Sequence, residues 1–192
     1  MNIAIYCGSS YGNDKKYNEK AKEVIKYLST KEVNIVYGGS NSGLMSTISN
    51  EAISYGMNIT GVITHKLALK EIENKNLNEI FKVNNIRERK AKMEELSDAF
   101  LALPGGFGTL EEISEVFTSI QIGNHNKPCA LYNLDGYYNK LIDFLQNCVD
   151  EGFLKQNHLD AIIISDDIEY IYNSFINYTP PKSKWELIQD SI

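Results

Sequence analysis

The sequence predicts a single α/β domain with a Rossmann-like, three-layer αβα sandwich fold and a mostly parallel sheet. Short apolar runs rich in β-branched residues alternate with stretches of helical periodicity, so that a strand–helix unit recurs about seven times in 192 residues. Two of the predicted strands contain the continuously apolar segments 100–103 and 161–164. Such strands are typical of a parallel sheet that helices cover on both faces.

The first half of the chain opens with a strand at residues 2–6, where apolar residues precede a turn rich in glycine and serine. A helix over residues 14–30 follows, because apolar residues recur there at helical spacing. These residues are Ala21, Val24, Ile25 and Leu28. The next predicted elements are a strand over 33–39 that runs into a glycine-rich loop, a helix over 43–54, a strand over 57–64, and a polar loop with short structured pieces over 65–80.

The second half begins with a brief strand at 80–83 and a charged helix at 86–97. An apolar strand over 98–106 then ends in a glycine-rich motif, after which the pattern predicts a helix over 110–122, a strand over 127–133, a helix over 136–152, a strand over 161–165 and a helix over 166–178. We therefore expect one domain over residues 1–178. Residues 179–192, which hold the only Pro-Pro pair, form a C-terminal extension.

The composition argues against nucleic acid, zinc and membrane as partners of this chain. The formal net charge is −6 and no run of Lys and Arg forms a basic stripe, which argues against a nucleic-acid surface. Three widely spaced cysteines without a CxxC pair predict free thiols in a reducing compartment rather than a disulfide framework or a zinc site. The N-terminus lacks signal-peptide character and no apolar run reaches membrane-spanning length, so we expect a cytoplasmic protein without a membrane partner.

Three glycine-bearing loops each follow a predicted strand, and each opens a helix. Glycine is the usual turn residue, so any one loop is compatible with turn chemistry alone. Three loops that converge at the carboxyl edge of a parallel sheet favour a cradle for an anion. The GxGxxG dinucleotide fingerprint and the GxxxxGK[ST] phosphate loop are both absent, which disfavours NAD binding and ATP hydrolysis.

The third loop continues into two adjacent glutamates with different predicted positions. If Thr109 is the N-cap of the following helix, Glu112 stands at N3 and the segment is a capping box. Helical geometry places Glu111 nearly opposite the apolar face, toward solvent or a partner, whereas Glu112 lies on the flank of that face. Glu112 is therefore either a capping residue or a carboxylate that meets a bound ligand.

Positive charge gathers at the start of the predicted helix 86–97. Cations at a helix N-terminus oppose the helix dipole, so their presence suggests a bound anion. A solvated basic face with i,i+4 partners, such as Lys90 with Glu94, is the alternative. The residues concerned are Arg87, Arg89, Lys90 and Lys92.

The basic segment 87–93 and the motif at 103–112 together resemble the LOG family of cytokinin riboside 5′-monophosphate phosphoribohydrolases, long labelled "possible lysine decarboxylase". The family pattern PGGxGTxxE is specific, and the likeness extends over about residues 2–155 through the segments CGSS and GLM and the stretch from KP to EGF. Here the pattern is made by Pro104, Gly105, Gly106, Gly108, Thr109 and Glu112.

The resemblance implies hydrolysis of the N-glycosidic bond of a nucleoside 5′-monophosphate, either AMP or a cytokinin riboside 5′-monophosphate, to free base and ribose 5-phosphate. It implies that Arg89 and Glu112 are the catalytic pair, that no metal or cofactor is required, and that the chain forms a homodimer or a higher homo-oligomer. The substrate-binding residues that it implies are Gly8, Ser9, Gly38, Gly39, Met45, Glu71, Arg89, Lys90, Pro104, Gly105, Gly106, Phe107, Gly108, Thr109, Leu110, Glu112 and Thr118.

The chain departs from the family pattern at a few positions, which bear on substrate preference. Ile86 and Arg87 replace the usual Met-His, and Ser40 and Ser46 stand where glycine is common. Two other functions compete with hydrolysis. A Rossmann-like protein with such loops can bind a nucleotide or molybdenum cofactor without cleaving it, whereas lysine decarboxylation would require a pyridoxal phosphate site in a much larger chain.

Overall fold

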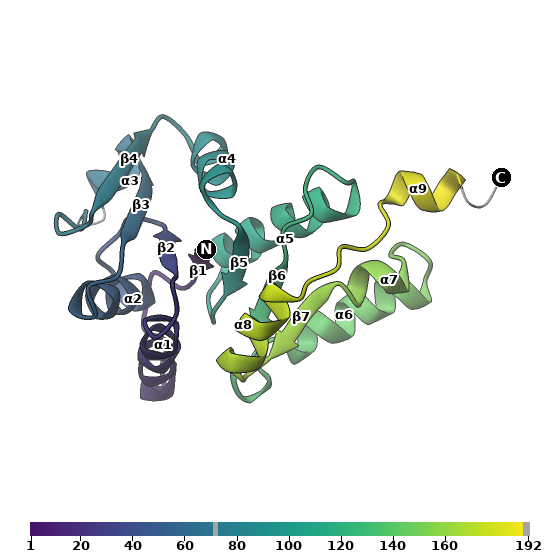
Figure 1. Cartoon of the computed structure of the whole chain (residues 1–192), viewed down its shortest axis with the longest axis horizontal. Helices are drawn as coiled ribbons and strands as arrows, with labels where there is room; N and C mark the ends of the chain where they lie inside the picture. Colours follow the sequence, from purple (N-terminus) through teal and green to yellow (C-terminus); the bar gives the residue numbers. More distant parts are fainter. Residues whose placement is uncertain (71–72, 190–192) are drawn as a thin grey trace.

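The computed structural model describes residues 1–70 and 73–189. Within these residues, seven parallel strands form one sheet in the order β4-β3-β2-β1-β5-β6-β7 (Figure 1). The α/β sandwich with a parallel sheet is therefore confirmed. The strands are β1 Asn2–Tyr6, β2 Asn34–Tyr37, β3 Ile59–Thr64, β4 Glu79–Val83, β5 Ala99–Ala102, β6 Cys129–Tyr132 and β7 Ile162–Ser165.

Helices cover both faces of the sheet (Figure 1). Successive residues of β1 point to opposite faces, as the period of a strand requires: Ile3 and Ile5 join one apolar cluster, and Ala4 and Tyr6 join the other. The first cluster contains side chains of α1 (Lys15–Leu28), α2 (Gly43–Ser54) and α8 (Ile168–Ile176), and the second those of α4 (Ile86–Leu96), α5 (Phe107–Gln121), α6 (Asn139–Asp150) and α7 (Gln156–Leu159). Short helices α3 (His65–Ala68), η1 (Leu134–Gly136) and α9 (Lys184–Gln189) complete the described elements.

The strand order reverses between β1 and β5, and this reversal positions the site. β1 ends at Tyr6 and β5 at Ala102, and these two residues pair in register. The loops that follow them therefore leave the sheet side by side, and the Gly8 N–H donates a hydrogen bond to the Pro104 carbonyl at 3.1 Å. Ligands of open α/β sheets bind at such a switch point, outside the carboxyl ends of the strands.

One predicted boundary is wrong in a way that matters for the site. α5 begins at Phe107 rather than at residue 110, and its N-cap is Gly106, in an extended conformation with φ −99° and ψ −151°. Thr109 is thus the third helical residue, which rules out the capping box, one of the two interpretations of Glu112 that the sequence left open. The Thr109 hydroxyl is buried against Gly105 instead, where a Cβ on that glycine would strike it.

The other differences concern element ends and short helices. The strand β1 agrees with the prediction and β4 begins one residue earlier than predicted. The other strands are shorter than predicted, because the predictions included residues of the adjoining turns, such as Gly38 and Gly39 after β2 and the segment 104–106 after β5. The four-residue helix α7 and the tail helix α9 were not predicted. No helix among the described residues is long and apolar enough to cross a membrane.

Candidate active site

A cavity of about 240 Å³ lies beyond the carboxyl ends of β1 and β5, between the first turns of α2 and α5. Its walls come from segments that are far apart in the sequence, and the fold brings them together at the switch point. The lining residues are Cys7, Gly8, Ser9, Met45, Leu67, Arg89, Gly106, Phe107, Gly108, Thr109 and Glu112.

Arg89 and Glu112 form an ion pair in the wall of this cavity. Arg89 Nη1 donates to Glu112 Oε1 at 2.7 Å, and Arg89 Nε donates to the Val62 carbonyl at 2.9 Å. The Arg89 and Glu112 side chains are only 12% and 9% exposed, respectively. The guanidinium reaches this position by crossing Gly38, because a Cβ at residue 38 would collide with Nη2. Gly38 is therefore needed for the path of Arg89 rather than for a direct contact with the cavity.

Burial sets the charge state of Glu112. Removal from water raises the pKa of its carboxyl above the ordinary 4.5, and the neighbouring Arg89 opposes this shift without cancelling it. Burial, together with the Glu112 charge, also raises the pKa of the Cys7 thiol, so Cys7 lines the cavity as a neutral group. The cavity thus contains one carboxylate that is held less tightly in its ionised form than a carboxylate at the surface.

We expect this pKa shift to appear in the pH dependence of folding. Because the folded-state pKa lies above the unfolded value, the unfolded chain releases the Glu112 proton first. The stability associated with the protonated group is therefore lost as pH rises from 4.5 through the folded-state pKa, by at most about 1.4 kcal/mol for each pH unit. Glu112→Gln removes this titration.

Urea unfolding of the native protein and of Glu112→Gln between pH 4 and pH 8 measures the effect. The free energy of unfolding of the variant should rise relative to the native protein across this range. Ser114→Ala, which changes no titratable group on the same helix, should show a constant difference. A Glu112→Gln difference that is flat or falls with pH would contradict the raised pKa.

The two helices that point into the cavity lack side-chain caps. The α5 N-cap, Gly106, has no side chain, and the side chain of the α2 N-cap, Ser42, accepts no hydrogen bond from the first turn of its helix. By contrast, the N-caps of α1 and α4, Asp14 and Asn85, do accept such bonds. In α2 the Leu44 N–H already donates to the Gly8 carbonyl at 3.1 Å. The first N–H groups of α5 have no such partner among the described residues, so they are available to an anion, and the dipole of α5 favours one.

The glycines of the α5 loop have a further property that indicates a ligand. A Cβ on Gly106 or Gly108 would meet no protein atom within 4 Å, and neither residue has a positive φ. Neither protein packing nor backbone conformation thus requires glycine at these two positions. Glycine also permits close approach of a ligand to the backbone, and the cavity lies at this place.

Two tyrosine hydroxyls bind the backbone of the loop between β5 and α5. The Tyr137 hydroxyl donates to the Gly105 carbonyl and the Tyr138 hydroxyl to the Leu103 carbonyl, both at 2.7 Å. These two tyrosines are not predicted from the sequence. The only signal is a pair of tyrosines after the next predicted strand, which does not show that they face the loop.

The basic cluster at the start of α4 divides into separate roles. Only Arg89 lines the cavity. Lys90 is 12% exposed and binds Glu111 and Glu115 on α5, not Glu94 as the i,i+4 alternative predicts. Lys92 pairs with Glu95, and Arg87 is exposed. Most of this charge therefore joins α4 to α5 or faces solvent.

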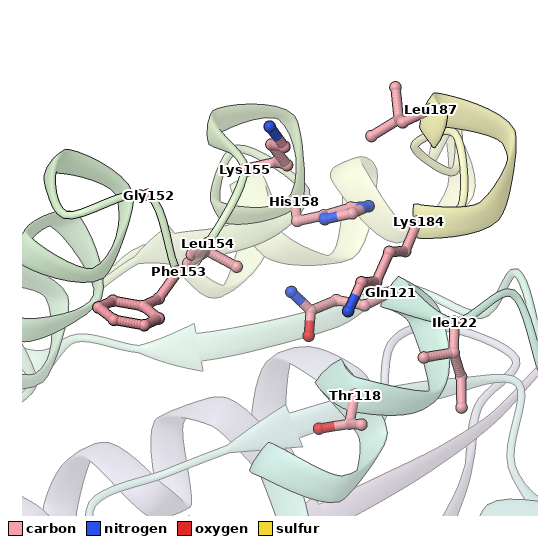
Figure 2. A pocket seen from close by; sticks show the side chains of 10 residues that line it. All are labelled: Thr118, Gln121, Ile122, Gly152, Phe153, Leu154, Lys155, His158, Lys184 and Leu187. Carbon is pink, nitrogen blue, oxygen red and sulfur yellow. The ribbon is translucent and has the colours of Figure 1, made fainter. Parts of the chain in front are cut away.

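Some of the predicted substrate-binding residues line the cavity, and others do not. Gly39 and Leu110 lie near it but not in its wall, and Thr118 lies six residues beyond Glu112 in a separate groove (Figure 2). Pro104 and Gly105 line an adjoining pocket of about 310 Å³ that shares Gly8, Ser9 and Gly106 with the cavity. Glu71 lies outside the described residues. Cys7 and Leu67 line the cavity and were not predicted, because small or apolar residues carry no distinctive signal.

Solved structures of similar fold include a molybdenum cofactor binding protein from Rippkaea orientalis, with a TM-score of 0.67 at 16% identity over 92% of this chain and 95% of that one. The molybdenum cofactor carrier protein from Chlamydomonas reinhardtii gives 0.66 at 15% identity, covering 92% of this chain and 98% of that one. At these identities the likeness concerns the fold alone.

Sequence relatives are much more similar. A family model described as possible lysine decarboxylase matches residues 45–175. The cytokinin riboside 5′-monophosphate phosphoribohydrolase LOG1 of Arabidopsis thaliana is 38% identical over 97% of this chain and 91% of its own length. The corresponding LOG4 enzyme is 39% identical over 93% of this chain and 83% of its own. The segment 104–112, which carries the resemblance in sequence, forms the glycine loop and the carboxylate of the site. This chain therefore belongs to the LOG family.

Proposed function

We propose that this protein hydrolyses the N-glycosidic bond of a nucleoside 5′-monophosphate, AMP or a cytokinin riboside 5′-monophosphate, to free base and ribose 5-phosphate. The observation that carries the proposal is the buried Arg89–Glu112 pair in a cavity that the N-terminus of α5, which has no side-chain cap, also borders. Relatives of about 38% identity that are named phosphoribohydrolases support it.

The 5′-phosphate is bound at the N-terminus of α5. Gly106, Gly108 and Thr109 line the cavity there, and the open N–H groups of the first turn donate to phosphate oxygens. This contact places the ribose beside Glu112, at the other side of the same cavity. Rupture of the bond between C1′ and the base nitrogen makes the ribose ring oxocarbenium-like and positively charged, and the Glu112 carboxylate stabilises this charge.

Water completes the reaction. A water molecule adds its oxygen to C1′, one of its protons is released, and the departing base takes up a proton at its nitrogen. Glu112 activates this water or acts through charge alone. Arg89 orients the ribose and the carboxylate, or supports the departing base. Both of these roles use the position in which Val62 and Glu112 hold the guanidinium.

Incubation with AMP tests the proposal. Chromatography should detect free adenine and ribose 5-phosphate in equal amounts, with adenosine and inorganic phosphate absent. A panel of monophosphates that includes N6-isopentenyl adenosine monophosphate then ranks the natural bases. If AMP binds in a calorimeter but no base is released from any member of the panel, the protein is a nucleotide binder and not a hydrolase.

Gly108→Ala separates ligand approach from folding. The added methyl group meets no protein atom, and alanine in the first turn of α5 should raise the free energy of unfolding by about 0.5–1 kcal/mol. It also projects into the space assigned to phosphate, so the Kd for AMP should rise at least ~10-fold, equivalent to about 1.4 kcal/mol. Urea unfolding and calorimetry measure the two effects.

Ser114→Ala is the matched control, because it is also a small-to-alanine change on α5 but lies outside the cavity. It should leave AMP affinity unchanged. If Gly108→Ala binds AMP as tightly as the native protein, the phosphate does not lie against the first turn of α5.

A homodimer is the assembly we propose, with the exposed side of α5 that includes Glu111 and Thr118 facing the second copy. Thr118 lies outside the cavity of its own chain, so any contact it makes with a nucleotide is to that of a partner copy. Size-exclusion chromatography with light scattering should give twice the chain mass of 21.7 kDa. Thr118→Arg should shift the mass to that of one chain. A native protein that elutes as a monomer at micromolar concentration would contradict this assembly.

The proposal also covers cofactors, the class of partner and the cellular location. The mechanism uses no metal ion or cofactor, and the substrate is a mononucleotide rather than a nucleic acid. Cys7 and Cys129 are buried free thiols, which fits the reducing conditions of the cytoplasm, where we place the protein.

A further inference from the structure

The turn between β6 and α6 has an unusual backbone. Asp135 has φ 48° and ψ 32°, and among the described residues it is the one non-glycine residue with a positive φ. Gly136, the next residue, has a φ of 75°. Left-handed backbone is disfavoured for any residue with a Cβ, although aspartate tolerates it better than most. A residue kept in this conformation indicates that the surrounding structure imposes it, often beside a functional site.

Contacts with the rest of the domain hold this turn in place. The Asp135 carboxylate pairs with Lys16 Nζ of α1 at 2.8 Å. The Tyr138 N–H donates to Asn133 Oδ1 at 2.7 Å. The turn is therefore fixed at both of its ends, and it directs the side chains of Tyr137 and Tyr138 toward the loop between β5 and α5.

Packing of the rings fixes the position of the Tyr137 hydroxyl. The Tyr137 ring meets the rings of Tyr17 and Tyr138 edge to face, with centroids 5.8 Å and 4.9 Å apart. From this position its hydroxyl donates to the Gly105 carbonyl at 2.7 Å. Because the ring has these contacts of its own, the hydroxyl holds the Gly105 carbonyl rather than being held by it.

The peptide bond between Gly105 and Gly106 turns this contact into a direction. No cis peptide bond occurs among the described residues, and in a trans peptide the C=O and the N–H point in opposite directions. The Gly106 N–H therefore points away from Tyr137. Tyr137 lines the adjoining pocket of about 310 Å³ but not the cavity, whereas Gly106 lines both, so this N–H faces the cavity. It makes no hydrogen bond with any residue that the structure describes.

Glycine on both sides makes this peptide easy to turn over. Neither Gly105 nor Gly106 has a Cβ to restrict the two backbone angles that flank the shared peptide. In the opposite orientation the peptide would present the Gly105 carbonyl oxygen to the cavity, and this oxygen would repel an anion. The loop sequence alone thus leaves open which atom a ligand meets, and the Tyr137 hydroxyl selects the N–H.

We propose that Tyr137 is a positioning residue for the 5′-phosphate, because its hydroxyl keeps the Gly106 N–H directed at a phosphate oxygen. The inference rests on the proposed function, in which this phosphate lies at the N-terminus of α5. Tyr137 does not touch the substrate and acts through one peptide bond. Its effect therefore concerns the phosphate and not the breaking of the glycosidic bond.

Tyr137→Phe tests the proposal, because it removes the hydroxyl and keeps the ring. The Kd for AMP and the Kd for ribose 5-phosphate should both rise by the same factor, about 5–10-fold, since a hydrogen bond to a charged oxygen is lost. The KM for AMP should rise in step while kcat stays within about 2-fold, because the phosphate is bound equally in the ground state and the transition state. Calorimetry and steady-state adenine release measure these values.

Tyr138→Phe is the matched comparison. It removes a hydroxyl from the next residue, which donates to the Leu103 carbonyl at 2.7 Å, but Leu103 is followed by Pro104, which has no N–H to direct. Tyr138 is buried, so Tyr138→Phe should lower the Tm by at least ~2 °C and leave the Kd for AMP within about 2-fold of the native value. Tyr137 is 42% exposed, so water replaces its hydroxyl and Tyr137→Phe should unfold near the native temperature.

The outcomes separate this inference from the hydrolase itself. If the native protein cleaves AMP, three results would each overturn the role of Tyr137: native affinity of Tyr137→Phe for AMP and ribose 5-phosphate, equal weakening by Tyr138→Phe, or a loss confined to kcat. If the native protein binds AMP without releasing base, the hydrolase is refuted, and a selective loss of affinity in Tyr137→Phe would still establish the role of Tyr137. A native protein that binds neither ligand would refute both.

Discussion

Glu112→Gln should bind AMP with near-native affinity and release adenine about 10²–10⁴-fold more slowly than the native protein. The amide has the shape of the carboxylate and can still accept a hydrogen bond from Arg89, so the cavity keeps its form. It has no negative charge to stabilise the ribose as it becomes positive, and it cannot accept a proton from water. The loss should therefore appear in kcat, with little change in the Kd for AMP.

The neighbouring glutamate is a matched control. Glu111→Gln removes an equal charge one residue away, but Glu111 is exposed and pairs with Lys90 outside the cavity. Its kcat should stay within a few-fold of the native value. Single-turnover measurement of adenine release, with calorimetry of AMP binding, compares the two variants. Full turnover by Glu112→Gln would reduce Glu112 to a structural partner of Arg89.

The fold could be predicted because its signals are local and repeated. The apolar segment 100–103 falls largely on β5, all of whose residues are buried, and the apolar face of α1 is buried as its spacing indicates. The second such segment, 161–164, falls instead on the edge strand β7, most of which is only partly buried. The start of α5 could not be predicted in the same way. Threonine is a good N-cap residue and glycine a weaker one, so sequence favours Thr109 over Gly106. Tertiary contacts decide otherwise, since the Thr109 side chain is buried under the loop.

The start of α5 also decides between the two interpretations of Glu112, a capping residue or a carboxylate in a ligand site. A capping glutamate would point back to the start of the helix, whereas the structure directs this side chain across to α4. The flank position of Glu112 was correctly derived from helical spacing. Its partner could not be derived in this way, because Arg89 lies 23 residues earlier and meets Glu112 only through the order of the strands. The family resemblance supplied that pair.

The sequence does not show what residues do when their role depends only on the space they leave or fill. Gly38 looked like a ligand-binding glycine, but its role in the structure is to let the Arg89 side chain pass. Leu67 and Cys7 enter the cavity wall as ordinary apolar or small residues. The separate groove that Thr118 lines likewise depends on where the tail helix α9 lies, and the sequence predicts the tail only as an extension.

Arg89→Lys should lower kcat/KM for AMP by about 10²-fold, although the positive charge is kept. The guanidinium reaches two partners at once, the Val62 carbonyl through Nε and Glu112 through Nη1. A lysine ammonium is a single point and cannot hold both positions. The carboxylate then loses its fixed orientation toward the ribose, and a displacement of about 1 Å is enough for a loss of this size. Steady-state adenine release measures it.

Gly38→Ala distinguishes position from charge in the same experiment. This variant keeps the arginine but pushes its flexible end aside, because the new Cβ would overlap Nη2; it would also press on Met45 Sδ, and both contacts are to flexible side chains rather than to backbone. If orientation of Glu112 is what Arg89 supplies, Gly38→Ala should lose activity together with Arg89→Lys, and combining the two changes should add little further loss. If charge alone matters, both variants should keep near-native kcat. Measuring whether the effects of Gly38→Ala and Arg89→Lys add therefore decides how Arg89 acts: by fixing the orientation of Glu112, or by its positive charge alone.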